Sequence, residues 1–197
     1  MITINEFFPV SVMQFEDTEL ADLARTVTDK VLEEKRLNNK ELSARAGPNA
    51  SITLNKSDLR GNTVLRTISA ALCEYCKTYL KHVGMSDAIH PEKVSLYVNN
   101  LGLYGSQETH MHCSSPVTGV LYVDIDPGSS PLVIENPNFF NHFTFEKFVL
   151  EHKLINQGLV TFSPANGRGV IFPGWLKHYV NTNYTEKRVV LTFVYYY

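Results

Sequence analysis

Two histidines two residues apart are the side chains of this sequence best suited to metal chemistry. Residues 107–112 read Gln-Glu-Thr-His-Met-His, a pattern that suits an extended strand. Alternate side chains of a strand point to the same side, so His110 and His112 would direct two imidazoles at one point. The pair alone would also fit a solvated strand face. A metal site is therefore indicated only if a third ligand joins the pair.

A third histidine follows much further along the chain. His178 ends a stretch in which the apolar strand 170–172 is followed by the turn Pro173-Gly174. We expect this turn to place His178 at the rim of a β-roll, opposite the first pair. Three ligands on one side of an iron ion leave open positions for a bidentate co-substrate and dioxygen.

Arg188 opens the last apolar strand of the chain, ten residues after His178. Its planar guanidinium pairs bidentately with carboxylates, whereas a structural arginine at the start of a strand is usually solvated or salt-bridged. We therefore expect Arg188 to hold a dicarboxylic acid. Asn100, in the pair Asn99-Asn100, could hydrogen-bond a substrate or co-substrate near the mouth of the roll, or simply begin a turn.

The elements that must position these residues change character along the chain. Apolar residues recur at helical spacing over residues 17–36 and 63–82, while residues 38–61 read as a mostly irregular connection. After Pro91 the pattern becomes period two and rich in β-branched residues. Strands are predicted at residues 94–98, 119–125, 131–135, 158–163, 168–172 and 188–196.

This order predicts an α+β fold, in which N-terminal helices buttress a double-stranded β-helix of the jelly-roll, cupin-like type. We expect one domain over residues 1–197. Residues 1–92 would form its helical support region and residues 93–197 its double-stranded β-helix core. Such a roll binds ligands between its sheets, where inward side chains converge.

Composition limits the kind of binding partner and the cellular compartment that we expect. The chain has 197 residues, and 18 Lys plus Arg against 20 Asp plus Glu give a net charge of -2, so a nucleic-acid partner is disfavoured. No stretch approaches the roughly 18 apolar residues that cross a bilayer. Cys73, Cys76 and Cys113 show no framework spacing, which fits a reducing compartment. We expect a cytoplasmic protein without a membrane segment.

Together these residues make the second half of the chain resemble the 2-oxoglutarate and Fe(II)-dependent oxygenase superfamily. The similarity is greatest to a small bacterial and phage branch with the pattern G-x-x-Q-x-x-H-x-H, a strand Ser/Thr-Gly-Val-x-Tyr-Val, and a late Phe-Pro-x-x-x-x-His followed by Arg. The matching stretches here are residues 102–112, with two extra residues before Gln107, residues 118–123, and residues 172–178 with Arg188.

The resemblance implies a role for each matching residue. His110, His112 and His178 would be the catalytic Fe(II) ligands, Arg188 would hold the distal carboxylate of 2-oxoglutarate, and Tyr122 would hydrogen-bond the same carboxylate. Most of the superfamily has Asp or Glu where this chain has His112, so the site would carry one less negative charge. A second departure is a valine at position 190, where relatives commonly have serine.

The implied reaction is hydroxylation of a peptide or protein side chain, or of a small molecule, with release of succinate and CO2. The alternative is a three-His cupin-like metal-binding protein or dioxygenase that does not use 2-oxoglutarate. We expect Leu96, Phe172 and Trp175 to line the pocket, although Trp175 could instead belong to the core. The segments 38–61 and 136–157 would shape access, and an exposed tyrosine at the C-terminal end could pair two copies into a homodimer.

Overall fold

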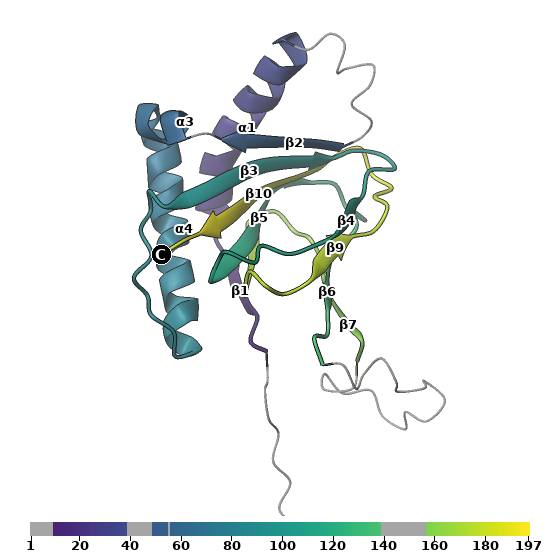
Figure 1. Ribbon diagram of the computed structural model, residues 1–197. Coiled ribbons are helices and arrows are strands. Elements are labelled where there is room, and N and C mark those ends of the chain that lie inside the picture. The colour runs from purple at the N-terminus through teal and green to yellow at the C-terminus, as the bar shows by residue number, and fades with distance from the viewer. Residues whose placement is uncertain (1–9, 39–48, 55, 139–156) are drawn as a thin grey trace, which may run out of the picture.

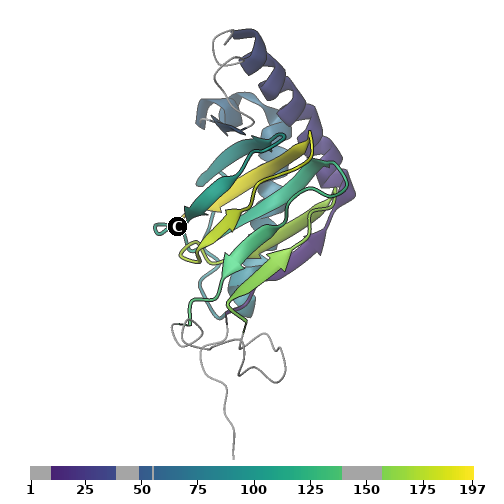
Figure 2. The ribbon, with the colours of Figure 1, turned by 90° about the vertical axis from the view of Figure 1, so that its right-hand side faces the viewer.

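The computed structural model describes residues 10–38, 49–54, 56–138 and 157–197. Two antiparallel sheets face each other, and helices α1 (Thr18–Asn38) and α4 (Thr63–His82) cover the outer face of the larger sheet (Figure 1). Viewed from the side of the smaller sheet, the larger sheet and the helices lie behind it (Figure 2). The predicted double-stranded β-helix buttressed by helices is confirmed.

The major sheet has six strands and the minor sheet has four. The major sheet has the order β1 (Met13–Glu16), β8 (Arg168–Phe172), β5 (Val117–Ile125), β10 (Arg188–Tyr195), β3 (Val94–Leu101) and β2 (Asn49–Leu54). The minor sheet has the order β4 (Gln107–His110), β9 (His178–Val180), β6 (Leu132–Glu135) and β7 (Leu159–Phe162). All neighbouring strands are antiparallel.

Alternation along the strands builds two separate apolar cores, because successive side chains of a strand point to opposite faces of its sheet. On β10, Leu191 and Phe193 belong to the core beneath the helices, whereas Val190 belongs to the core between the sheets. All eight residues of β10 are buried. The strand that begins at Arg188 therefore has one face in each core.

The two long helices begin and end where the sequence predicts. Asp17 caps α1, since its side chain accepts a hydrogen bond from the Leu20 amide at 2.9 Å. Asn62 caps α4 in the same way, through the amides of Val64 and Leu65. The chain leaves α4 at Gly84, whose φ of 73° favours glycine. Cys73 and Cys76 of α4 are both fully buried.

The prediction of an irregular connection over residues 38–61 is wrong for much of its length. Strand β2 pairs with β3 along the edge of the major sheet, and the short helix α3 (Lys56–Gly61) follows it. The short strands β1 and β9 were not predicted either. These strands are too short to show a clear alternation in the sequence, so only their pairing with neighbouring strands identifies them. Residues 39–48, part of the first predicted access loop, and residues 139–156, most of the second, lie outside the described residues.

Two further expectations concern a membrane segment and the tyrosines at the C-terminal end. Within the described residues, no helix combines the length and the apolar character that a membrane crossing would need. Tyr195 is fully buried, while Tyr197 is about half exposed. A contact between two copies through Tyr197 stays a prediction.

Candidate metal centre and active site

Three histidines converge at one edge of the minor sheet. His110 on β4 lies directly opposite His178 on β9, and their ring centroids are 4.2 Å apart. His112, just after β4, lies 5.3 Å from His110 and 5.4 Å from His178 by ring centroids. One ring nitrogen from each histidine lies within 4.8 Å of the other two. These three residues form the only such His, Cys, Asp or Glu group of three or more that the described residues contain.

The predicted convergence is thus observed, but the expected position of His178 is wrong. His178 does not lie at the rim on the far side of the roll; it is 4% exposed and sits on the strand next to His110 in the same sheet. Strand β9 follows the Pro173-Gly174 turn and pairs with both β4 and β6. Two of the three histidines therefore come from neighbouring strands in register.

Backbone carbonyls set the orientation of two of the rings. His110 Nδ1 lies 2.8 Å from the Glu108 carbonyl, and His178 Nδ1 lies 2.8 Å from the Leu176 carbonyl. A carbonyl only accepts, so each Nδ1 carries the proton and each Nε2 keeps its lone pair. This is the arrangement in which histidines bind metals through Nε2. His112 Nε2 is buried and has no hydrogen-bond partner among the described residues, and a bound ion would supply one.

Burial keeps two of the imidazoles neutral. It lowers the pKa of His178 to about 3, with the Leu176 carbonyl opposing the shift and the neighbouring His110 and His112 adding to it. It also lowers the pKa of His112 to about 4, with repulsion from His110 as the second cause. Metal ligands must be deprotonated, so both rings are ready to bind a cation at neutral pH. Neutral imidazoles suit iron among the divalent metals, and the donor set fits such an ion.

Gly174 allows the segments that carry His112 and His178 to pack closely. The His112 amide donates to the Gly174 carbonyl at 2.6 Å. A Cβ on Gly174 would lie 2.6 Å from the His112 carbonyl oxygen and closer still to that of Ser115. No side chain fits there without moving backbone. The turn before β9 therefore needs glycine for steric reasons.

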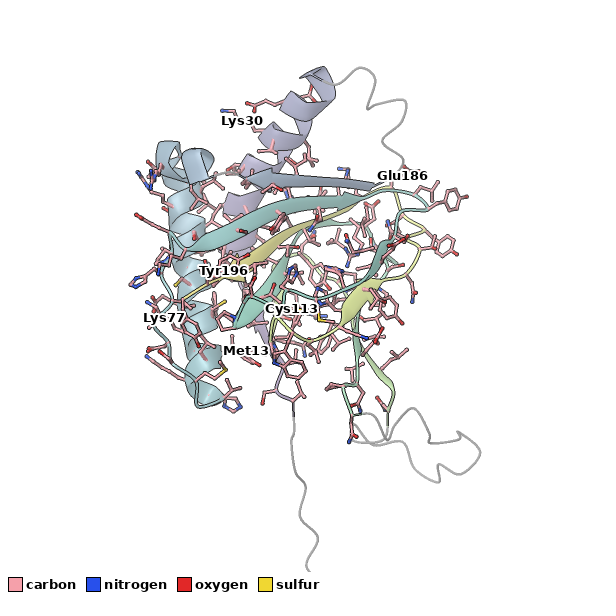
Figure 3. The ribbon with its side chains drawn as sticks, viewed as in Figure 1. Met13, Lys30, Lys77, Cys113, Glu186 and Tyr196 are labelled. Atoms are coloured by element: carbon pink, nitrogen blue, oxygen red, sulfur yellow. The ribbon has the colours of Figure 1, made fainter. Side chains whose placement is uncertain are left out.

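A cavity of about 260 Å³ opens between the two sheets, and the three histidines and Arg188 all line it. Its apolar wall includes Val120, Phe172 and Val190. Asn99 and Thr192 give it a polar strip, since the Asn99 amide donates to the Thr192 hydroxyl at 2.8 Å. Side chains fill the rest of the space between the sheets (Figure 3).

Arg188 is a buried cation, only 2% exposed. Its Nε donates to the Ser130 carbonyl at 2.8 Å, and its guanidinium carbon lies 5.6 Å from the centre of the Tyr122 ring. Burial lowers the pKa of Arg188 and raises that of Tyr122. Within the described part of the chain, no carboxylate forms an ion pair with Arg188. A buried charge without a counter-ion is costly, so the cavity is suited to an anionic ligand.

Several residues predicted to line the site lie elsewhere. Asn100 is absent from the cavity lining, and its neighbour Asn99 takes that place, because the pleat turns alternate residues of β3 to opposite faces. Leu96 belongs to the core beneath the helices. Trp175 is 48% exposed, so it neither lines the cavity nor packs in the core.

Asp124, Asp126 and Cys113, which are near the histidines in the sequence or on the next strand, lie outside the histidine group. Asp124 pairs with the Lys187 ammonium at 3.3 Å, and Asp126 accepts the Lys187 amide. Neither aspartate belongs to the histidine group. Cys113, labelled in Figure 3, is exposed and also stands outside it.

Gln107 and Thr192 line the cavity, although neither was expected to, and of the pair Asn99-Asn100, expected near the mouth, Asn99 lines it. For Asn99 a signal existed. Residues 94, 96 and 98 are the apolar face of β3, so the alternate face with Tyr97 and Asn99 had to meet something other than the helix core. Gln107 and Thr192 carry no such signal, because their roles depend on where the strands pair.

Comparison with known proteins agrees with this geometry. A model of the family described as "Putative 2OG-Fe(II) oxygenase" matches residues 95–193, half of the chain. No match is found among the curated proteins.

Similar solved structures support the fold. A prolyl-4-hydroxylase from Pseudomonas putida has a TM-score of 0.63 at 13% identity, over 95% of this chain and 94% of that one. A prolyl hydroxylase from Trichoplax adhaerens, in complex with a hypoxia inducible factor peptide fragment, has a TM-score of 0.59 at 12% identity, over 94% and 83%.

An oxidoreductase of the 2OG-Fe(II) oxygenase family from Burkholderia pseudomallei aligns with a TM-score of 0.40 at 13% identity. The alignment covers 52% of this chain and only 43% of that one. The family's name states the cofactors that membership implies, Fe(II) and 2-oxoglutarate, and the three imidazoles fit the iron. On the match over residues 95–193, the chain belongs to the 2OG-Fe(II) oxygenase family.

Proposed function

We propose that this oxygenase hydroxylates a peptide or protein side chain, or a small molecule, and converts 2-oxoglutarate to succinate and CO2. One observation carries the proposal: a single cavity joins three inward-facing histidines to a buried arginine that has no ion-pair partner among the described residues. The overall reaction balances, since one oxygen atom of O2 enters succinate and the other enters the substrate C–H bond.

In this proposal His110, His112 and His178 hold Fe(II). Bound iron would supply the activation of dioxygen, coupled to the decarboxylation of the keto acid. The protein side chains supply positioning. The carbonyls of Glu108 and Leu176 keep two rings in the tautomer that binds through Nε2.

Arg188 would hold the distal carboxylate of 2-oxoglutarate. Charge-assisted bonds from a guanidinium are strong and directional, and they strengthen where water is excluded. Tyr122 is buried beside the guanidinium, with its hydroxyl 3.4 Å from the Phe162 carbonyl. As the structure stands, Tyr122 is not among the residues that line the cavity. We propose that, when the keto acid binds, the Tyr122 hydroxyl turns its single proton from the Phe162 carbonyl to the same carboxylate. The apolar wall of Val120, Phe172 and Val190 would keep water from the reacting groups.

The three-His ligand set favours an anionic co-substrate. Three neutral imidazoles leave the full charge of a divalent cation in place, whereas the usual carboxylate ligand would cancel part of it. A dianionic keto acid would then meet two positive groups in one cavity, the metal and Arg188. The extra charge offers a reason why a site without a carboxylate ligand can still bind 2-oxoglutarate.

The size of the cavity bears on the substrate class. Sites that enclose a whole small-molecule ligand are usually of roughly 300–1,000 Å³, and this cavity, at about 260 Å³, is smaller. With the keto acid inside, the remaining space suits one side chain of a larger molecule. The Trichoplax adhaerens neighbour, which shares the fold, is described in complex with a peptide. Both points favour a peptide or protein substrate.

The test is anaerobic binding followed by aerobic turnover. Fe(II) and 2-oxoglutarate together should give a weak visible charge-transfer band, and calorimetry should detect the keto acid only when metal is present. Succinate release over a panel of peptides should then identify a substrate. No band and no keto-acid binding would refute the proposal.

The three-His set also favours a second candidate, a cupin-like dioxygenase or metal-binding protein that uses no keto acid. The supporting observation is that the described metal-ligand group contains no carboxylate. This candidate predicts metal-dependent oxygen consumption that is indifferent to added 2-oxoglutarate. Oxygen-electrode traces with and without the keto acid separate the two functions.

A further inference from the structure

A buried asparagine on the β9–β10 connection uses its whole hydrogen-bonding capacity. Asn183 is 0% exposed. Its Nδ2 donates to the carbonyls of Leu101 at 2.8 Å and Thr185 at 2.9 Å. Its Oδ1 accepts from the Ser130 amide and the Thr185 hydroxyl, both at 3.1 Å. Two donors and two acceptor sites are all that a carboxamide offers, so no part of this side chain is left for a ligand.

One of these contacts leads directly to Arg188. Ser130 donates its amide to Asn183, accepts from Arg188 Nε through its carbonyl at 2.8 Å, and donates its hydroxyl to the Thr182 carbonyl at 2.8 Å. Every polar group of Ser130 is therefore paired. Asn183 and the guanidinium of Arg188 bind the same residue through its two backbone groups.

The other contacts lead to the loop between β3 and β4. The Asn183 carbonyl accepts from the Tyr104 amide at 2.6 Å, and the Asn183 amide donates to the Gly105 carbonyl at 2.7 Å. Tyr104 has a φ of 67°, a conformation that a tyrosine rarely adopts and that persists only where surrounding contacts fix it. Asn183 thus joins the end of β3, which lines the cavity at Leu101, to the segment that holds Arg188.

We propose that Asn183 is a positioning residue for Arg188, the group that would bind the distal carboxylate of 2-oxoglutarate. By fixing Ser130 it fixes the acceptor of Arg188 Nε, and this bond sets the plane in which the guanidinium can meet a carboxylate. A free arginine side chain samples many rotamers, and bidentate pairing requires one orientation. The inference rests on the proposed role of Arg188 in binding 2-oxoglutarate.

The test compares Asn183→Ala with Ser69→Ala in the full-length chain. Ser69 is an equally buried polar residue, 0% exposed, whose hydroxyl donates to the Pro91 carbonyl at 2.6 Å beneath the helices, far from the cavity lining. Anaerobic calorimetry on Fe(II)-loaded protein gives the Kd of 2-oxoglutarate, and a separate titration gives the Kd of Fe(II). Both variants should lower the Tm.

We expect Asn183→Ala to raise the Kd of 2-oxoglutarate at least about tenfold, since small misplacements of a binding group have large effects, with the Fe(II) Kd within about twofold. Ser69→Ala should leave both constants unchanged. A loss of Tm in Asn183→Ala with a wild-type Kd for 2-oxoglutarate would reduce Asn183 to a structural residue and overturn the proposal.

Two further variants keep the outcomes separate. If Asn183→Ala does not fold, Ser130→Ala removes only the bond to Thr182 and should still raise the Kd of 2-oxoglutarate by roughly threefold, or about 0.65 kcal/mol. An unchanged Kd overturns the proposal. Arg188→Met tests the proposed function, on which the inference about Asn183 rests. If Arg188→Met binds 2-oxoglutarate like the wild type, the proposed function fails, whereas a loss there with no effect at Asn183 or Ser130 refutes this inference alone.

Discussion

Replacing Arg188 by methionine should weaken co-substrate binding by about 100-fold or more without destabilising the ligand-free protein. Arg188 is 2% exposed and has no ion-pair partner among the described residues. Removing one member of a buried ion pair costs about 3–5 kcal/mol. For a guanidinium–carboxylate pair with 2-oxoglutarate, the lower value raises the Kd by about 100-fold or more.

The effect on folding should have the opposite sign. Desolvating an unpaired cation costs several kcal/mol, and burial accordingly lowers the pKa of Arg188. Methionine removes that cost but leaves the Ser130 carbonyl without its Nε donor, a loss of about 1–3 kcal/mol. The first effect is the larger, so the free energy of unfolding should rise by about 1 kcal/mol and the Tm by roughly 2–4 °C.

Thermal unfolding under anaerobic conditions, with Fe(II) and with or without 2-oxoglutarate, measures both effects. Wild-type protein at a keto-acid concentration 100 times its Kd should gain about 2.7 kcal/mol, whereas Arg188→Met, with a Kd about 100-fold higher, should gain about 0.4 kcal/mol or less. Arg168→Met is the matched control: this arginine of β8 is partly exposed and pairs with Glu16, so the response to 2-oxoglutarate should persist. A ligand-free Arg188→Met that melts well below wild type, or one that 2-oxoglutarate stabilises as much as wild type, would refute the reasoning.

Three other expectations concern the metal centre. His112→Ala should weaken Fe(II) binding more than about 100-fold, which exceeds the effect of losing an outer-shell partner. His112→Asp should retain the metal but bind 2-oxoglutarate less tightly, because the added negative charge repels the keto acid. Metal and keto-acid titrations measure both affinities, and equal behaviour of the two variants would contradict the ligand role. Gly174→Ala should cost about 1–3 kcal/mol of stability and reduce metal affinity, because its Cβ would displace the backbone of His112 and Ser115; an unchanged Tm would count against this account. In metal-free protein, the pKa of His178 is about 3 when folded and near 6.5 when unfolded, so its contribution to the free energy of unfolding is constant above pH 7 and is lost as the pH falls below 6.5. Denaturant titrations should show that the free energy of unfolding falls by about 2 kcal/mol from pH 7.5 to 5, and by less in His178→Gln. An equal pH dependence in the two proteins would disprove the assignment.

The sequence by itself determined which residues could do chemistry and most of the elements that carry them. The predicted strands over 94–98, 119–125 and 168–172 and both long helices lie where their periodicity placed them. Periodicity is a local property, since it depends only on residues two to four positions apart, and it needs no knowledge of the partner strand. The cluster of His110, His112 and His178 could be predicted because the resemblance supplied the convergence that no local pattern contains.

Tertiary structure decided the rest, because it depends on hydrogen-bond register between distant strands. The pairing of β9 with β4 set His178 beside His110 rather than across the roll. The pleat of β3 decided that Asn99 and not Asn100 lines the cavity. The position of β10 between two cores left Arg188 buried without an acid partner among the described residues, and no spacing in the sequence records that isolation.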